Sequence, residues 1–361
     1  MGIHEIIFFS GFLLFIALML LIDLGVFNKK DHIVSFKEAG IWSLIWVSFA
    51  LGFYALLLTN GQRIHGIENF QELSTVISNY VAHPEDIKII ADNFEASLQN
   101  YRQHIALEFI TGYLLEYSLS VDNIFVIIMV FTSFGVKKEY YKKVLLWGII
   151  GAIIMRFIFI FLGSVLIQNL SWILYIFAAF LIYSGLKMLF SKDEDENIDP
   201  ENHPVVRFLG RYFAVHPHFV GSNFFYRPTH DTATVKKGAL MITPLFVTVV
   251  VVEMTDLIFA VDSVPAVFSV TKDPYIVFFS NIFAIMGLRS MFYFLSNIMH
   301  LFHYLKTGLS FLLIFIGAKM FAHGWLKGLG FENYHSLLIV VSILAISVLA
   351  SLIFPKSKEA A

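Results

Sequence analysis

The sequence predicts an all-α polytopic membrane protein with about nine transmembrane helices, an inverted three-helix repeat and interrupted helices at its acidic motifs. Three observations favour this class. Of the 361 residues, 58% are hydrophobic and 14% are charged, whereas soluble domains carry about 25% charged residues. The mean hydropathy is +0.74, and apolar runs of bilayer-spanning length recur along the chain. Two similar acidic motifs lie inside such runs.

Nine segments are long and apolar enough to cross a bilayer. The first has neither the basic start nor the small-residue cleavage site of a signal peptide, so we expect it to be retained as a helix. In chain order the predicted spans are 6–27, 39–59, 104–134, 144–167, 171–190, 239–270, 276–298, 305–323 and 335–354.

The distribution of basic residues predicts the orientation. If the nine spans alternate, 17 of the 25 Lys and Arg residues fall in connections on one side of the membrane and five on the other. The side rich in Lys and Arg is normally cytoplasmic. We therefore expect the N-terminus outside and the C-terminus in the cytoplasm.

The whole chain, 1–361, is expected to form a single transmembrane domain with two long connections. An acidic loop that we expect to form a small helical cap lies outside, and a polar loop lies in the cytoplasm. The predicted parts are the outer loop 60–103, a first repeat 104–190, the cytoplasmic loop 191–237, a second repeat 238–323, and a final helix with a cytoplasmic tail, 324–361.

Three features recur in the same order in the two halves. Acids six residues apart come first: Glu116 and Asp122, then Asp256 and Asp262. A helix with an arginine after a glycine follows, and then a helix ending in Gly-x-Lys-Met. Because each unit has an odd number of helices, the two copies enter the membrane from opposite faces. Many secondary transporters are built from such inverted repeats, with the substrate site where the repeats meet.

The two motifs, GYLLEYSLSVDNIFV and VVVEMTDLIFAVDSVPA, place five acids at membrane depth: Glu116, Asp122, Glu253, Asp256 and Asp262. On insertion scales each costs roughly 2.5–3.5 kcal/mol, or about 10–18 kcal/mol together. Only a bound cation, protons or the two intramembrane arginines can neutralise them. The pattern therefore predicts a protein that passes cations.

A straight helix would not gather these acids on one side. Six residues rotate by about 600°, so Glu116 and Asp122 would point about 120° apart. Pro265 removes a backbone donor, and Ser118 and Ser120 compete for backbone bonds, so we expect both helices to be interrupted at the motifs.

Secondary ligand candidates supply amide, hydroxyl and further carboxylate oxygens: Asn123, Ser120, Thr255, Ser263 and, more weakly, Asp23. Such oxygens suit hard cations such as Mg²⁺, Ca²⁺ or Mn²⁺. Mn²⁺ is the favoured substrate, although the ligand chemistry alone does not separate these three. Surplus acids could exchange protons, which favours proton-coupled antiport.

Arg156 and Arg289 have two readings that the sequence leaves open. They neutralise the acids when no cation is bound, or they are permanently paired with a carboxylate or a lipid phosphate. In the purely structural alternative, all the acids serve as buried ion pairs. Five acids exceed two arginines, which argues against that alternative.

Other function classes are disfavoured. There are no cysteines, which excludes thiolate metal sites, and the net charge of −2 offers no basic surface for nucleic acid. The sequence has no nucleophile elbow, phosphate loop, HExxH or dinucleotide motif. We expect no enzyme activity and no permanently bound cofactor, with the bilayer, a divalent cation and protons as partners.

The chain also resembles the TerC family, named for tellurium resistance, within the LysE transporter superfamily. The resemblance covers almost the whole chain and rests on DLGVF, TGYLLEYSLSVDN, WGIIGAIIMR, GLKM, TPLFV, DLIFAVDSVPAVFSVTKDPYIVFFSNIFAIMGLRS and GAKM. It implies a bacterial inner-membrane protein of metal-ion homeostasis, and the five acids occupy the family's acidic motifs.

Members of the family include manganese exporters and proteins tied to tellurite resistance, alkaline pH or metalation of exported proteins. The resemblance does not choose among these roles. The competing hypothesis is a membrane scaffold that docks resistance or secretion proteins through the cytoplasmic loop 191–237, with the acids structural. Amino-acid export, which the superfamily suggests, is disfavoured.

Overall fold

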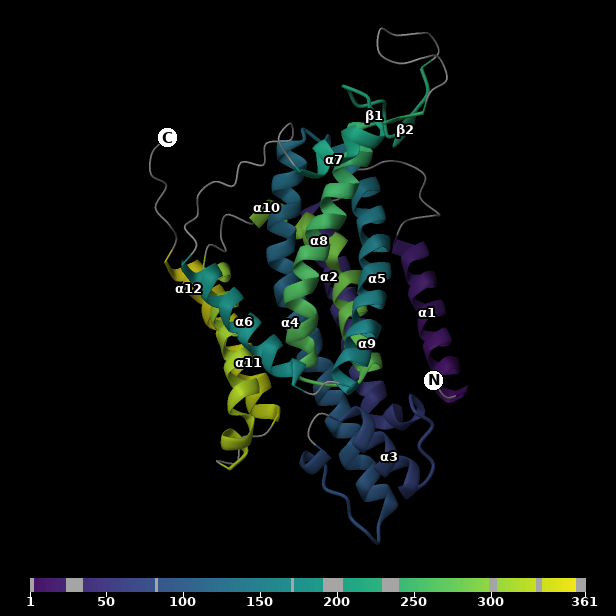
Figure 1. Cartoon of the computed structure of the whole chain (residues 1–361), viewed down its shortest axis with the longest axis vertical. Helices are drawn as coiled ribbons and strands as arrows, with labels where there is room; N and C mark the ends of the chain where they lie inside the picture. The colour runs from purple at the N-terminus through teal and green to yellow at the C-terminus, as the bar shows by residue number, and fades with distance from the viewer. Residues whose placement is uncertain are drawn as a thin grey trace.

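Long helices run side by side along the longest axis of the molecule, with a small helical layer at one end and a short sheet at the other (Figure 1). The computed structural model describes residues 3–23, 35–81, 84–169, 172–190, 204–228, 240–298, 304–328 and 333–354. The all-α polytopic membrane class predicted from composition is confirmed.

Twelve α-helices and two short 3-10 helices make up the described fold. They are α1 (Ile3–Asp23), α2 (Phe36–Asn60), η1 (Gly61–Arg63), α3 (Phe70–Tyr80), η2 (Pro84–Asp86), α4 (Phe94–Ser133), α5 (Lys138–Asn169), α6 (Ile173–Phe190), α7 (Pro204–Tyr212), α8 (Pro244–Phe268), α9 (Pro274–Met286), α10 (Leu288–Ile298), α11 (Leu305–Gly328) and α12 (Asn333–Ile353).

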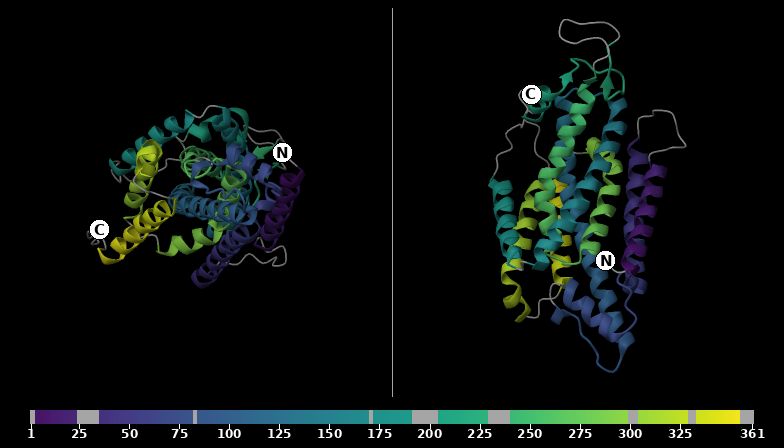
Figure 2. Two further views of the ribbon diagram at one scale, coloured as in Figure 1. Left: turned by 90° about the horizontal axis from the view of Figure 1, so that it is seen from below. Right: turned by 45° about the vertical axis from the view of Figure 1, so that its right-hand side comes forward.

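Within the described residues, five helices are long and apolar enough to cross a membrane: α1, α2, α5, α8 and α12. The pair α9 and α10, bent by 41° at Gly287, makes a sixth candidate. Helices α4, α6 and α11 run beside them (Figure 2) but do not meet the same length and composition criteria. Nine spans therefore stays a prediction.

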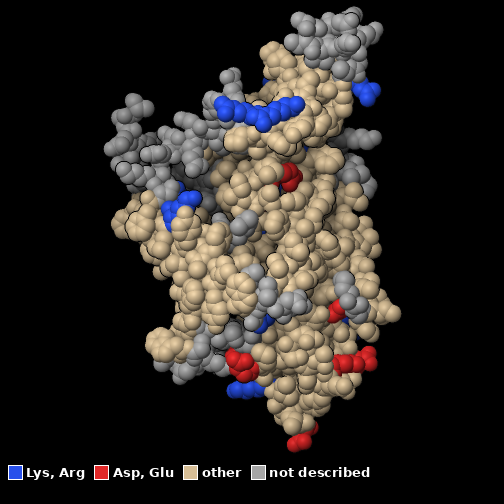
Figure 3. All heavy atoms as spheres, in the orientation of Figure 1, with Lys and Arg blue, Asp and Glu red and all other residues tan. Residues whose placement is uncertain are grey.

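The surface supports a membrane-embedded middle. On the face shown in Figure 3, Lys and Arg gather near the sheet end and most Asp and Glu near the opposite end. Between them lies a band that is almost free of charged side chains. Large apolar residues of the long helices α5 and α8 are exposed, among them Ile154, Leu162 and Ile258. Such a band suits contact with lipid chains.

A helical cap, defined as residues 61–81 and 84–103, covers one end of the bundle. Asn69 and Asn93 begin α3 and α4 by accepting hydrogen bonds from backbone N–H groups of the first turn. Leu73 and Ile77 of α3 and Leu98 of α4 are buried in the same apolar cluster as the cap-side half of the bundle. The cap is thus packed onto the bundle.

At the opposite end, three two-residue strands form a sheet that the sequence analysis does not predict. β3 (Met241–Ile242) pairs in parallel with β1 (Ala214–Val215) and antiparallel with β2 (Phe225–Tyr226). Strands this short lack a readable alternation of apolar and polar residues, so they carry no sequence signal. The sheet fixes the segment that leads into α8.

The prediction of interrupted helices at the acidic motifs is wrong. α4 is helical through all 40 of its residues and α8 through all 25. The hydroxyls of Ser118 and Thr255 donate to the Leu114 and Val251 carbonyls of their own helices instead of breaking them. Pro265 lies in the last turn of α8, where it removes one backbone hydrogen bond without ending the helix.

The acidic stretches lie between two apolar clusters. One cluster joins the cap, α1, α2, α9 and the cap-side part of α4, and the other joins the far end of α4 to α5, the start of α8 and α10. Glu116 lies on α4 between Tyr113, a buried residue of the first cluster, and Ile124, a buried residue of the second. Leu119, at the same level, belongs to a third apolar cluster with α11, so packed apolar side chains flank the polar ones.

Helices α6 and α11 cross closely at two glycines. A Cβ at Gly185 would lie 2.8 Å from the Ser310 carbonyl oxygen, and one at Gly317 would lie 2.6 Å from the Ala178 carbonyl oxygen. Each contacted residue lies seven positions before the other glycine, so the crossing is symmetric. The two glycines belong to the matching Gly-x-Lys-Met segments of the proposed repeat, and the repeat itself stays a prediction.

We expect Gly317→Ala to destabilise the protein by about 1–3 kcal/mol, because the added methyl group must push α11 away from a backbone carbonyl. Gly52→Ala in α2 is the matched control, since a Cβ there meets nothing within 4 Å. Thermal unfolding in detergent measures both. Equal melting temperatures for the two variants would contradict this description of the crossing.

Candidate ion site

Arg156 of α5 lies at the centre of the candidate site, and its side chain is 0% exposed. Its Nη1 donates to Oε1 of Glu116 on α4 and to Oδ1 of Asn281 on α9. Its Nη2 lies 3.6 Å from Oδ1 of Asp256 on α8. One buried guanidinium therefore joins four helices, including both helices that carry the acidic motifs.

Several polar atoms around this cluster are buried and have no hydrogen-bond partner in the described structure. They are Oε2 of Glu116, Oγ of Ser120, Nδ2 of Asn123, Oδ2 of Asp256, Oγ of Ser263, and Nε and Nη2 of Arg156. A buried polar atom without a partner costs about 1–3 kcal/mol, so such a concentration calls for a functional reason. All five residues with unpartnered oxygen or amide atoms are ligand candidates on helices α4 and α8, and two of them, Glu116 and Asp256, contact Arg156.

Glu253 lies one turn before Asp256 on α8 and faces α5. Its carboxylate occupies the space that a Cβ on Gly151 would fill. Gly151 thus leaves room for an acid on the neighbouring helix α8. It is the glycine that precedes Arg156 in the repeated sequence pattern. This close approach holds the Glu253 carboxylate on the side of α8 that packs against α5.

The structure brings together three predicted site residues, Glu116, Asp256 and Arg156. Ser120, Asn123 and Ser263 are buried on the same helices, and the Thr255 hydroxyl is engaged by its own helix. Arg289 is buried at the start of α10, beyond the bend at Gly287. The side chains of Asp122, Asp262 and Asp23 lie outside the part that the structure describes.

No group of three or more His, Asp or Glu side chains among the described residues is arranged to hold a metal ion. Asp122 and Asp262, two of the five predicted ligands, do not enter that comparison. In this arrangement the guanidinium of Arg156 takes up the charge of Glu116 and Asp256. Both readings of Arg156, as a neutraliser and as a permanent partner, predict such contacts.

Asn281 is a site residue that the sequence analysis misses. It lies in α9, where all 13 residues are buried, and its Nδ2 donates to the Val277 carbonyl while its Oδ1 accepts from Arg156. The available signal was an amide within the apolar run YIVFFSNIFAIM. Such an amide in a membrane helix needs a partner, and here the partner is a charge.

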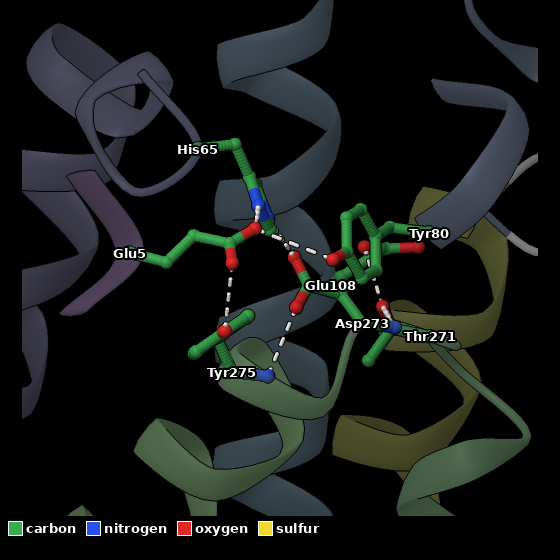
Figure 4. A network of polar contacts seen from close by, with 7 residues as sticks. All are labelled: Glu5, His65, Tyr80, Glu108, Thr271, Asp273 and Tyr275. Atoms are coloured by element: carbon green, nitrogen blue, oxygen red, sulfur yellow. Dashed lines mark hydrogen bonds and ion pairs between the residues drawn. The ribbon is translucent and has the colours of Figure 1, made fainter. Parts of the chain in front are cut away.

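A second polar network, also missed, lies where the cap meets the bundle (Figure 4). His65 connects two carboxylates: its Nδ1 is 2.9 Å from Oε1 of Glu5, and its Nε2 is 2.8 Å from Oδ2 of Asp273. The hydroxyls of Tyr80 and Tyr275 donate to the two oxygens of Glu5. The network ties α1, the cap and the start of α9 together, residues too far apart in sequence to be linked by a motif.

The two carboxylates control the protonation of His65. Burial alone would lower its pKa, but charge interaction and hydrogen bonding with Asp273 and Glu5 outweigh burial and raise the pKa from 6.5 to about 9. Burial and the Glu5 carboxylate likewise raise the pKa of Tyr80 to about 12. His65 is therefore a cation at neutral pH, which makes both of its bonds charge-assisted.

A model of the family described as "Integral membrane protein TerC family" matches residues 101–359. This chain belongs to the TerC family. The matched region of this TerC protein contains Glu116, Arg156, Asp256 and Asn281, and it excludes α1, α2 and most of the cap. The central site is thus part of the family domain, while Glu5, His65 and Tyr80 of the second network lie before it.

Similar proteins extend over nearly the whole TerC chain. An uncharacterized membrane protein of Myxococcus xanthus is 39% identical over 97% of this chain and 93% of its own. A protein of Escherichia coli K12 with the name "Putative membrane-bound redox modulator Alx" is 39% identical over 86% of this chain and 84% of its own. An uncharacterized membrane protein of Rickettsia felis is 33% identical over 94% of this chain and 95% of its own. No solved structure matches.

We expect Arg156→Ala to destabilise this TerC protein by about 3–5 kcal/mol, because the substitution leaves two buried carboxylates without their cation. The double variant Arg156→Ala with Glu116→Ala removes one of those carboxylates and should recover part of the loss. Denaturant unfolding in detergent, analysed as a double-mutant cycle, measures the coupling. A denaturant midpoint unchanged by Arg156→Ala would contradict this picture.

The His65 network should weaken as pH rises. A pKa raised on folding contributes stability that is fully present below the unfolded value of 6.5 and is lost as pH rises through about 9. The shift in the pKa of His65 corresponds to about 3 kcal/mol of folding stability. Thermal unfolding between pH 6 and 10 should show this decline in wild type and a flatter profile in His65→Gln. His218→Gln, an exposed histidine, is the control, and identical profiles for wild type and His65→Gln would contradict the assignment.

Proposed function

We propose that this protein exports divalent metal cations from the cytoplasm, with Mn²⁺ as the favoured substrate, in exchange for protons. The observation that carries the proposal is the arrangement around Arg156. Two carboxylates from helices α4 and α8 meet one guanidinium inside the bundle, and their remaining oxygens have no hydrogen-bond partner in the described structure.

The ligand chemistry supports a hard cation. Carboxylate oxygens of Glu116 and Asp256, with hydroxyl oxygens of Ser120 and Ser263, match the oxygen ligands that Mg²⁺, Ca²⁺ and Mn²⁺ prefer. Asp122, Asp262 and Asn123 belong to the same motifs, and Asp23 is a further candidate. A site built from these groups would bind copper(I) poorly because it contains no sulfur ligand.

In the proposal, Arg156 neutralises the carboxylates of the site when no cation is bound. A guanidinium and a divalent cation compete for the same carboxylates, because both need negative charge within contact distance. In the proposed cycle, cation binding replaces the Arg156 contacts, and cation release restores them. Arg289, in the corresponding position of the second repeat, is proposed to play the matching part.

Proton coupling follows from the surplus of acids. Glu253 is half-buried beside Gly151, one turn from Asp256, and has no basic partner among the described contacts. Carboxylates in this position are neutralised by protons when no cation is present. Exchange of protons for the cation keeps the charge inside the membrane low in both states.

The relatives are bacterial membrane proteins, which supports the proposed location in the bacterial inner (cytoplasmic) membrane, with the N-terminus outside and the C-terminus in the cytoplasm. The physiological role we propose is metal homeostasis, with tellurite or alkaline-stress resistance as an outcome in some settings. The E. coli relative is named for redox modulation. The present 361 residues contain no cysteine, so thiol chemistry of their own forms no part of the proposal.

A scaffold function is the second candidate, and one observation favours it. Next to the sheet, the aromatic side chains of Phe208, Tyr212, Phe213 and Phe225 are exposed by 47–70%. Aromatic residues gathered at one end of a membrane protein suit either the bilayer interface or a docked protein. A scaffold would use this end and would not depend on the buried acids.

The two candidates differ in their response to neutralised acids. We expect wild type to lower cell manganese after a manganese load in an exporter-deficient strain, while Asp122→Asn, Asp262→Asn and Asp256→Asn lose at least about tenfold in efflux rate. Elemental analysis of manganese, iron, calcium, magnesium and zinc in the same cells, at equal membrane abundance of each variant, makes the comparison.

Asp92→Asn, which changes an exposed cap residue, is the control and should behave as wild type. The same metal content with wild type, variants and empty vector would rule out export of these metals. In that case the next experiment is to identify proteins that bind the end of the molecule that bears Phe208, as the scaffold candidate requires.

A further inference from the structure

Three carboxylates are buried together at the level where the cap meets the bundle: Glu5, Glu108 and Asp273, with 8%, 2% and 2% of their surfaces exposed. They come from α1, from α4 and from the residue that begins α9. Figure 4 shows them on neighbouring elements, converging on one region. Nothing in the proposed metal site uses them.

Glu108 is engaged on both oxygens. Its Oε1 lies 3.1 Å from Nε2 of His104, one turn earlier on α4, and its Oε2 accepts a hydrogen bond of 2.8 Å from the Thr271 hydroxyl. Thr271 Oγ1 in turn accepts from the backbone N–H of Asp273. A chain of short polar contacts thus links the Glu108 and His104 pair to the residue that holds His65.

The Tyr101 hydroxyl is the unusual member of this region. It is buried, has no hydrogen-bond partner, and interacts electrostatically with Asp273, Glu108, Tyr80 and Glu5. A phenol can both donate and accept, and leaving it unpaired costs about 1–3 kcal/mol. This hydroxyl lies among three acids, so it is available to form a hydrogen bond with a bound proton or a hydrated proton.

The charges of the network leave room for one proton. Protonated His65 and the ammonium of Lys319, which lies near Glu108 and Asp86, offset two of the three buried carboxylates. His104 is the remaining imidazole that faces Glu108, and Asp86 lies at the exposed rim. One further proton on the Glu108 and His104 pair would bring the net charge of these buried groups to zero.

A metal ion does not fit the described geometry equally well. No three His, Asp or Glu side chains among the described residues are placed to hold one. The two ring nitrogens of His65 face different acids, so Glu5 and Asp273 cannot converge on a common ion with it. The groups that remain, imidazoles, carboxylates and phenols, are proton donors and acceptors.

The network lies on the cap side of the central site. Glu108 precedes Glu116 by eight residues on α4, and Asp273 precedes Asn281 by eight residues at the start of α9, which is about 12 Å along each axis. The hydroxyls of Thr111 and Ser280 lie at intermediate heights on the same two helices. The levels match because Glu108 and Asp273 are both hydrogen-bonded to Thr271, and Glu116 and Asn281 both accept hydrogen bonds from Arg156.

We propose that the Glu5, Glu108 and Asp273 network is a proton-binding station on the outer side of the transporter. It takes one proton from external water onto the Glu108 and His104 pair and passes it inward to the carboxylates of the central site as the cation leaves. This inference rests on the proposed function, because it assigns the entry point of the exchanged proton.

The test separates proton coupling from cation binding. Purified protein in liposomes is given Mn²⁺ in two modes: exchange of Mn²⁺ for Mn²⁺ at equal pH on both sides, and net Mn²⁺ movement driven by a pH gradient. Exchange needs a competent cation site, whereas gradient-driven transport also needs the proton station. The variants are Glu108→Gln and Tyr101→Phe, with Glu95→Gln on the exposed start of α4 as control.

We expect Glu108→Gln to lower gradient-driven transport at least about tenfold while exchange stays within about twofold of wild type. Tyr101→Phe, which removes a single oxygen and preserves the packing, should lower the same mode in the same direction. Glu95→Gln should change neither mode, because it alters only an exposed ion pair.

Gradient-driven transport that survives in both variants would overturn the inference. Equal loss of both transport modes in folded Tyr101→Phe would also overturn it, since the network would then only stabilise the fold. If wild type performs neither mode, the proposed function itself fails. Infrared titration of the protonated carboxyl band gives a readout without transport: a band present in wild type and absent in Glu108→Gln is expected, and identical spectra would contradict proton binding at Glu108.

Discussion

The free-energy cost of placing carboxylates inside a membrane protein governs the structure around Arg156. Glu116 is fully buried and Asp256 nearly so, and a guanidinium compensates both at once. Because those contacts come from α4, α5, α8 and α9, the electrostatic requirement also fixes how four helices meet. Apolar clusters lie on either side of this layer, and a charge interaction is stronger in such apolar surroundings than in water.

Buried carboxylates are compensated at two levels of the molecule, each by a different type of basic side chain. At the central layer an arginine that cannot lose its proton compensates the acids. Under the cap, His65 compensates Glu5 and Asp273, and histidine can lose its proton. One layer is therefore suited to exchange a cation against a fixed positive charge. The other is suited to exchange protons, and the two are joined through α4 and α9.

Composition and hydropathy were sufficient to predict the helical membrane class, and the acidic motifs pointed to Glu116, Asp256 and Arg156. The interruption of α4 and α8 was predicted wrongly, because Ser118 and Thr255 satisfy their hydroxyls within the helix and Pro265 falls in a last turn. Asn281 and the His65 network escaped prediction because their partners are 125 and 208 residues away. Only the folded chain shows which polar residues meet.

In the proposed cycle, the carboxylates around Arg156 bind a divalent cation in place of the guanidinium. Electron paramagnetic resonance of free Mn²⁺, titrated with purified protein, measures this binding. We expect wild type to remove the free Mn²⁺ signal in a saturable manner, and Glu116→Gln and Asp256→Asn to bind at least about tenfold more weakly. A signal unchanged by wild type, or removed equally well by both variants, would contradict it.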